Sequence, residues 1–146
     1  MSHSYVSVYL HLVFSTKERK SLIKLEDQKL LWSYITGIAK NHKMKCLAVG
    51  GMEDHIHILV SSNSEHGVAK IVNTLKSNSS KWMRGKDKTF AWQEGYGAFS
   101  VSQSGLEDVM EYIHNQAAHH RKRDFKQEFF GLLRLHGHEP DQWTLG

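Results

Sequence analysis

Two histidines one residue apart are the first candidates for chemistry in this chain. They lie in the segment Asp54-His55-Ile56-His57-Ile58-Leu59-Val60. If this segment is a β-strand, His55 and His57 share one face and the isoleucines share the other, because alternate side chains of a strand point to opposite faces. Their backbone positions are then about 6–7 Å apart, close enough for both rings to reach one divalent ion. A lone His-x-His is more often part of a half-exposed strand, so a metal site needs a second element beside it.

The second element is a predicted helix that begins at Leu106 and runs to about Arg121. Its apolar residues form one stripe at Leu106, Val109, Met110, Ile113 and Ala117. Tyr112 and Gln116 are four residues apart, so they lie on one face beside this stripe. A tyrosine hydroxyl is a possible nucleophile, and a glutamine oxygen is a possible ligand for a hard metal ion. The pair becomes a site only if this helix docks next to the histidine strand.

The periodicity of the remaining sequence predicts the elements that would position these residues. Strands are expected at residues 5–14, 45–49, 55–61 and 98–102, and helices at 25–42, 68–83, 106–121 and 125–135. Gly50-Gly51 is expected to begin the turn between the second and third strands. This order predicts an α+β fold: a ferredoxin-like βαββαβ antiparallel sheet with added C-terminal helices. In that fold the first and third strands are neighbours, which would bring His11 near His55 and His57.

Composition places few limits on function. The 146 residues suggest one domain over 1–146, and the formal net charge of +4 with a pI near 9.2 is a modest indication of a polyanionic partner. Cys46 is the only cysteine, which excludes an internal disulfide and a cysteine zinc site. Neither a signal peptide nor a membrane-length apolar run is seen, so a cytoplasmic protein without membrane contact is expected. No nucleotide-binding glycine loop is present either.

Five motifs in one order resemble the HUH single-tyrosine transposases, the small insertion-sequence transposases that act on single-stranded DNA, and their REP-associated relatives. The motifs are His11-Leu12-Val13-Phe14-Ser15-Thr16-Lys17, Asp54-His55-Ile56-His57-Ile58-Leu59, the helix at 68–82, the run Trp92-Gln93-Glu94-Gly95-Tyr96 with Phe99-Ser100-Val101-Ser102, and Tyr112-Ile113-x-x-Gln116. The resemblance covers residues from about 5 to 133.

The resemblance implies a function and a role for each site residue. Tyr112 would attack a DNA phosphorus and hold the 5′ end as a phosphotyrosine, while His55, His57 and Gln116 would bind one Mg²⁺ or Mn²⁺. The family acts as a homodimer on hairpin-bearing single strands, and its tyrosine helix completes the site of its own or of the partner subunit. Asp54 and His11 are candidates to orient the two histidine ligands.

Contacts with DNA and between subunits are expected outside this centre. The basic residues nearest the motifs are Arg121, Lys122 and Arg123 after the tyrosine helix, and Lys17 and Arg19 after the first strand. Trp92, Tyr96 and Phe99 could stack on unpaired bases, although packing beneath the loop is equally compatible with Trp92. The short strand at 98–102 is expected at a sheet edge, where it could pair with a second copy.

Other readings of the histidine motif fit less well. A histidine-triad hydrolase needs a third histidine where this chain has Leu59, and a metallo-β-lactamase-like hydrolase needs Asp-His where Leu59-Val60 stand. A ferredoxin-like nucleic-acid-binding module without catalysis remains the alternative. The joint presence of Tyr112, His55, His57 and Gln116 favours catalysis over this alternative.

Overall fold

A computed structural model describes residues 4–62, 65–120 and 123–141. Its sheet is antiparallel and four-stranded, in the order β2-β3-β1-β4. The strands are β1 (Val8–Ser15), β2 (Lys45–Gly51), β3 (His55–Ser62) and β4 (Gly97–Val101). The helices are α1 (Leu25–Asn41), α2 (Val68–Arg84), α3 (Leu106–His114), α4 (Gln116–His119) and α5 (Phe125–Leu135), with single 3₁₀ turns at Lys17–Arg19 and Gln103–Gly105. The predicted α+β ferredoxin-like order is confirmed.

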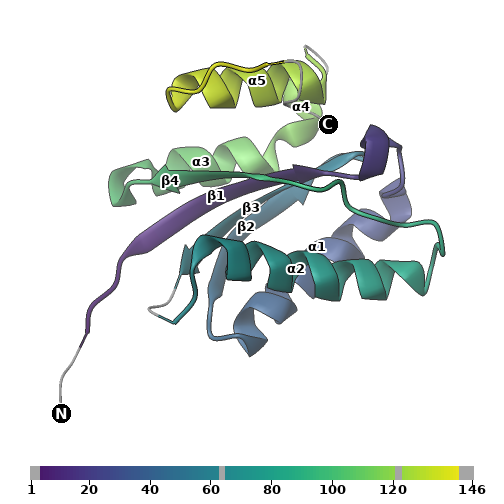
Figure 1. Cartoon of the computed structure of the whole chain (residues 1–146), viewed down its shortest axis with the longest axis horizontal. Helices are drawn as coiled ribbons and strands as arrows, with labels where there is room; N and C mark the ends of the chain where they lie inside the picture. Colours follow the sequence, from purple (N-terminus) through teal and green to yellow (C-terminus); the bar gives the residue numbers. More distant parts are fainter. Residues whose placement is uncertain (1–3, 63–64, 121–122, 142–146) are drawn as a thin grey trace.

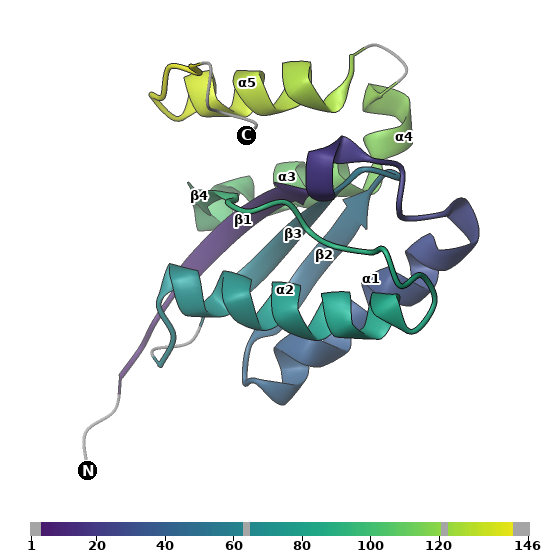
Figure 2. The same cartoon turned by 45° about the vertical axis from the view of Figure 1, so that its right-hand side comes forward.

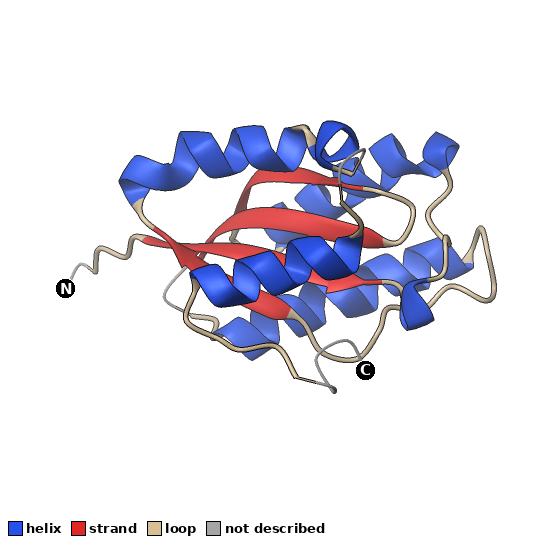
Figure 3. Ribbon diagram, turned by 90° about the horizontal axis from the view of Figure 1, so that it is seen from above, coloured by secondary structure: helices blue, strands red, loops and turns tan. Residues whose placement is uncertain are grey.

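Helices cover both faces of the sheet, which gives three layers (Figures 1 and 2). α1 and α2 pack on the face formed by alternate apolar residues of the two central strands: Leu10, Leu12 and Phe14 of β1, and Ile56, Ile58 and Val60 of β3. The view from above shows the sheet between its helical layers (Figure 3). None of the helices in the described part of the chain is long and apolar enough to cross a membrane.

The opposite face carries the histidines and is divided between α3 and α5. α3 covers β2 and β3 through Ile113, which packs with Ala48 and Leu59. α5 covers β1 and β4 through Phe125 and Phe129, which pack with Val13 and Phe99. The histidines of β1 and β3 therefore lie beneath the junction of α3, α4 and α5.

Most boundaries lie within a residue or two of the sequence-based expectations, and three features differ in ways that matter for the site or the fold. The first strand begins at Val8 rather than Tyr5, whose side chain is almost fully exposed. The helix expected at 106–121 is interrupted at Asn115 (φ −102°, ψ 28°), so Tyr112 belongs to α3 and Gln116 to α4. Gly50 and Gly51 continue β2 rather than begin a turn.

Gly50 is needed for a close approach rather than for chain reversal. A Cβ atom built on it would collide with the backbone carbonyl of Ile113 in α3 and lie 3.1 Å from the Ile113 side chain. Glycine at this position thus sets how closely α3 packs on β2, and Tyr112 is the residue before Ile113.

We expect Gly50→Ala to push α3 away from the sheet, to lower the free energy of unfolding by about 1–3 kcal/mol, and to reduce any Tyr112-dependent activity by more than tenfold. Gly37→Ala is the matched control, because nothing lies within 4 Å of a Cβ atom at Gly37 in α1. The control should keep full activity and unfold at the same or a higher temperature. Equal activity of the two variants would show that the Gly50 contact does not position the tyrosine.

Candidate active site

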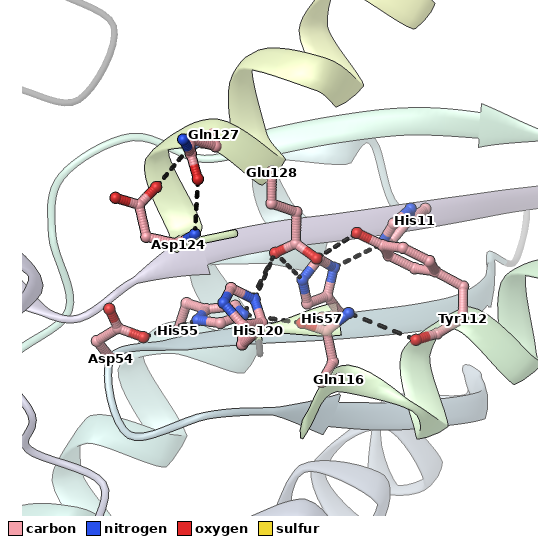
Figure 4. Close-up of polar contacts among 10 residues, drawn as sticks. All are labelled: His11, Asp54, His55, His57, Tyr112, Gln116, His120, Asp124, Gln127 and Glu128. Carbon is pink, nitrogen blue, oxygen red and sulfur yellow. Dashed lines mark hydrogen bonds and ion pairs between the residues drawn. The ribbon is translucent and has the colours of Figure 1, made fainter. Parts of the chain in front are cut away.

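The two histidines of β3 form the floor of a buried polar site (Figure 4). His55 and His57 are both fully buried, and their ring centroids lie 5.1 Å apart. They share the face that β3 turns toward α3 and α5, as strand alternation predicts. His11 of β1 also points into this face, and its Nε2 lies 2.8 Å from Nδ1 of His57.

The break at Asn115 lets α3 and α4 direct two side chains toward these histidines. Gln116 is 2% exposed, and its Oε1 lies 3.0 Å from Nε2 of His55. Its amide Nε2 donates back to the Tyr112 carbonyl at 3.4 Å, which orients the oxygen toward His55. The ring of Tyr112 lies edge-on to that of His57, with 5.7 Å between centroids. Tyr112, Gln116, His55 and His57 therefore meet within one chain.

Glu128 of α5 joins these groups, although the sequence analysis did not select it. Its carboxylate is fully buried. Oε1 accepts from Nε2 of His57 at 3.0 Å and from Nε2 of His120 at 3.1 Å, and it lies 3.4 Å from Nε2 of His55. Oε2 accepts a hydrogen bond from the hydroxyl of Tyr112. One carboxylate thus links the tyrosine to both strand histidines.

A capping box fixes the start of α5 and with it the position of Glu128. The Asp124 carboxylate accepts from the backbone N–H of Gln127 at 2.9 Å, and the Gln127 side chain accepts from the backbone N–H of Asp124 at 3.0 Å. The sequence does carry signals for Glu128. Asp124-x-x-Gln127 marks the helix start, and residue 128 falls on the stripe of Phe125, Phe129 and Leu132. A carboxylate on an apolar stripe indicates a specific buried partner.

Asp54 and His11, the candidates to orient the two histidines, each contact one of them. Nδ1 of His55 donates to Oδ1 of Asp54 at 2.8 Å, and Nδ1 of His57 faces His11. Each of the two strand histidines therefore has its second nitrogen held by another side chain, an arrangement typical of metal-binding histidines. These contacts leave the Nε2 atoms of His55 and His57 pointing at the same space.

The donor set fits a cation. Nδ1 of His55 is directed to Asp54, and its Nε2 faces Oε1 of Gln116 and Oε1 of Glu128. Electron-rich atoms that face one another in a buried site are stable only with a proton or a metal ion between them. His55, His57 and Glu128 each offer one possible ligand atom, and these three atoms lie within 4.8 Å of one another. Imidazole, carboxylate and amide oxygen are ligands for Mn²⁺, and the oxygens also suit Mg²⁺.

Burial and the carboxylate set the protonation of the site. Burial, with the neighbouring His57, lowers the pKa of His11 to about 3, so this ring is neutral near pH 7. Burial also lowers the pKa of His57. Burial alone would raise the pKa of Glu128. The hydrogen bond and charge of His57, the hydrogen bond from Tyr112 and the charge of His55 lower this pKa overall. Burial and the ionised Glu128 raise the pKa of Tyr112, so without a bound cation the hydroxyl keeps its proton.

Removal of the His11 ring should weaken metal binding without removing a ligand. We expect His11→Ala to lower the affinity for Mn²⁺ about 10–100-fold, because Nδ1 of His57 loses its partner. Isothermal titration of the metal-free protein with MnCl₂ measures this change. His114→Ala, on the exposed side of α3, is the control and should bind like the unaltered protein. An unchanged affinity of His11→Ala would mean that His11 does not support the metal site.

Three of the five predicted DNA-binding residues lie in the described part of the chain. Lys17 and Arg19 are exposed in the turn after β1, whose last residue, Ser15, pairs with His55. Arg123 is exposed just before α5 and lines a cavity with Tyr112. Arg121 and Lys122 lie outside the described residues. Trp92 packs against Phe14, and its indole N–H donates to Ser79 at 2.9 Å, which supports the packing interpretation of this residue.

Known proteins share sequence and fold with this chain. Residues 4–116 match the model of the family described as IS200-like transposases. The chain is similar to the ISDra2 transposase TnpA of Deinococcus radiodurans, with 25% identity over 114 residues that cover 73% of this chain and 81% of the relative.

Two solved structures share the fold. A D. radiodurans R1 structure described as a transposase has a TM-score of 0.63 at 24% identity and covers 80% of this chain and 96% of its own. The structure of a REP-associated tyrosine transposase bound to a REP hairpin has a TM-score of 0.61 at 12% identity, covering 82% and 73%. The family match spans most of the chain, including β1, β3 and α3 with their histidines and tyrosine, and the chain therefore belongs to the IS200-like transposase family.

Proposed function

We propose that this transposase cleaves and rejoins single-stranded DNA at hairpin-bearing element ends, with Tyr112 as the nucleophile. One divalent ion, Mg²⁺ or Mn²⁺, would be held by His55, His57 and the side-chain oxygens of Gln116 and Glu128. One observation carries the proposal: a single buried carboxylate, Glu128, contacts the Tyr112 hydroxyl and the Nε2 atoms of both strand histidines. The proposed nucleophile and the proposed histidine ligands thus contact the same carboxylate.

The proposed reaction exchanges one phosphoester bond for another. The Tyr112 oxygen attacks the phosphorus, and as the new O–P bond makes the hydroxyl acidic its proton passes to Oε2 of Glu128, which already accepts it in a hydrogen bond. The 3′ oxygen of the cleaved strand leaves and takes up a proton from solvent to become a hydroxyl, and the 5′ phosphate stays on Tyr112. In the rejoining step a 3′ hydroxyl attacks the phosphotyrosine and releases Tyr112. The ester bond is kept throughout, so no nucleotide cofactor is needed.

A divalent ion, when bound, would polarise the scissile phosphate and neutralise charge that develops on it. Glu128 changes the charge balance expected from the sequence. Two imidazoles and one amide leave the full +2 charge of an ion, whereas the carboxylate reduces it to +1. The remaining charge still favours a phosphate oxygen as a further ligand. Glu128 would then share its charge with the ion, which weakens its stabilisation of the protonated Tyr112 hydroxyl.

Support for a hairpin substrate comes from the relative whose structure is described as bound to a REP hairpin. On this chain, Lys17 and Arg19 lie at the β3 end that carries His55, and Arg123 lies near Tyr112. We propose that these residues contact the phosphates on either side of the cleaved bond. The contacts of Arg121 and Lys122 stay predictions.

A homodimer joined through β4 is also proposed. β4 is the last strand of the sheet, and among the described residues no strand pairs with its outer edge. An open edge can pair with its own copy about a two-fold axis. Multi-angle light scattering should then give twice the chain mass of 16.8 kDa at micromolar concentration. A single-chain mass, both with and without hairpin DNA, would contradict this assembly.

A covalent-adduct assay tests the proposed function against the alternative of a non-catalytic DNA-binding module. The full chain is incubated with single-stranded oligonucleotides that carry the hairpins flanking its own gene, with MgCl₂, MnCl₂ or EDTA. We expect a protein–DNA band that survives SDS with either metal and is absent with EDTA. Hairpin binding in a gel shift without any such band, over all oligonucleotides and both metals, would favour the binding module.

A further inference from the structure

A second cavity adjoins the metal-ligand set but contains none of it. Its volume is about 690 Å³, and its walls include Gln93, Glu94, Tyr96, Phe99, Phe125 and Phe129. Phe125 is the shared wall: its ring stacks on that of His55, with 4.5 Å between centroids and 24° between planes. Phe125 therefore contacts a proposed metal ligand and also lines this cavity.

We infer that this cavity receives an unpaired nucleobase of the cleaved strand, from a nucleotide next to the scissile phosphate. The inference rests on the proposed function, because it takes the metal site as the position of that phosphate. Phe125 contacts His55 and lines the cavity. When the phosphate lies at the metal site, the base of a neighbouring nucleotide is therefore close to this cavity.

The lining of the cavity suits a base better than a phosphate. Tyr96 is 41% exposed and offers an accessible aromatic ring, and such rings stack on bases of any sequence. The buried rings of Phe99, Phe125 and Phe129 form the apolar part of the wall. The polar residues of the wall are Gln93, Glu94, His138 and Glu139 among others. The two glutamates disfavour a phosphate, and their carboxylates can accept hydrogen bonds from exocyclic amino groups. Adenine, cytosine and guanine carry such groups and thymine does not. The volume lies in the range typical of small-molecule sites.

The walls are held in place before any ligand binds. Nζ of Lys76 donates to the carbonyls of Gln93 at 2.7 Å and Gly95 at 2.8 Å, which fixes the loop that leads into β4. At Gly97 a Cβ atom would lie 2.8 Å from the Phe129 ring and 2.9 Å from the Phe99 ring. The absence of a side chain at Gly97 thus lets both rings pack at the cavity wall. A preformed site loses less conformational entropy on binding.

Methyl NMR of the full chain in EDTA tests this inference without metal or cleavage. The probes are dAMP, dTMP and inorganic phosphate, and the reporters are the methyl groups of Ala98 and Leu133, which line the cavity. Val109 and Leu135 line the separate cavity beside Tyr112 and serve as internal controls. We expect dAMP to shift Ala98 and Leu133 selectively, dTMP to bind more weakly, and inorganic phosphate to shift neither.

Two neighbouring phenylalanines give a matched pair of variants. Phe129→Leu keeps an apolar side chain but changes the shape of the apolar wall, and it should weaken dAMP binding about tenfold. Phe130→Leu is the control, since Phe130 instead faces Lys126 and Arg134 and does not line the cavity. Glu94→Ala, at an exposed position, should remove most of the preference for dAMP over dTMP.

The results separate this inference from the proposed function. Shifts centred on Val109 and Leu135, equal shifts with inorganic phosphate, or no shifts with dAMP would overturn the base site. A metal-dependent covalent adduct together with any of these results would leave the proposed function standing. Selective dAMP shifts without an adduct would support the base site and contradict the proposed cleavage.

Discussion

Tyr112→Phe should abolish the covalent protein–DNA adduct, with at least about a 10³-fold loss of cleavage rate, while hairpin binding persists. The substitution removes only the oxygen that would attack phosphorus. Glu128 loses one hydrogen bond but keeps those from His57 and His120, so the free energy of unfolding should fall by no more than about 1–2 kcal/mol. Adduct formation is measured on denaturing gels, and hairpin affinity by fluorescence anisotropy.

Two other tyrosines are the controls for this variant. Tyr34 stacks on Trp82, with 4.8 Å between ring centroids, in the helical layer on the far side of the sheet. Tyr96 lines the 690 Å³ cavity, and its side chain is exposed. Tyr34→Phe and Tyr96→Phe should both form the adduct. An adduct that survives in Tyr112→Phe would remove Tyr112 from the reaction.

His57→Ala should eliminate metal-dependent cleavage and lower the affinity for Mn²⁺ by at least about 100-fold. The imidazole is fully buried and contacts both Glu128 and His11, so its removal takes one nitrogen out of the proposed ligand set. Hairpin binding should remain, because the exposed basic residues that we expect to contact phosphates lie outside the ligand set.

Leu59→Ala is the control that distinguishes a loss of metal binding from a loss of stability. Leu59 is the next residue on the same face of β3, is fully buried and packs against Ile113. The variant should lose about 2–5 kcal/mol of stability, yet the folded fraction should bind Mn²⁺ normally. Cleavage by His57→Ala at the rate of the unaltered protein would contradict the metal-ligand assignment.

Local patterns predicted the elements that carry the site. The alternation along β3 placed His55 and His57 on one face, and the four-residue spacing placed Tyr112 and Gln116 on one side of their helical segment. The ferredoxin-like strand order then brought His11 beside His57. Each of these inferences needs only the period of a strand or helix and the neighbours within one sheet.

The contribution of α5 depends on tertiary packing and was not predicted. Glu128 reaches the site because Phe125 and Phe129 anchor α5 over β1 and β4, and no local period specifies that docking. The break at Asn115 was also missed, since the residues from Leu106 to Arg121 include no proline or glycine. That break ends α3 between Tyr112 and Gln116, yet both side chains reach the same site, as their four-residue spacing predicts.

Mass-spectrometric mapping of the trapped adduct tests most directly whether Tyr112 is the residue that attacks DNA. Trypsin does not suit this purpose, because Tyr96 and Tyr112 lie between Lys88 and Arg121 without an intervening lysine or arginine. A glutamate-specific protease cleaves after Glu94, Glu107, Glu111 and Glu128, which places Tyr96 in peptide 95–107 and Tyr112 in peptide 112–128. We expect the nucleotide mass on peptide 112–128, or on 108–128 if the adduct blocks cleavage after Glu111. A nucleotide on peptide 95–107, or on the Tyr34 peptide 27–53, would contradict the account.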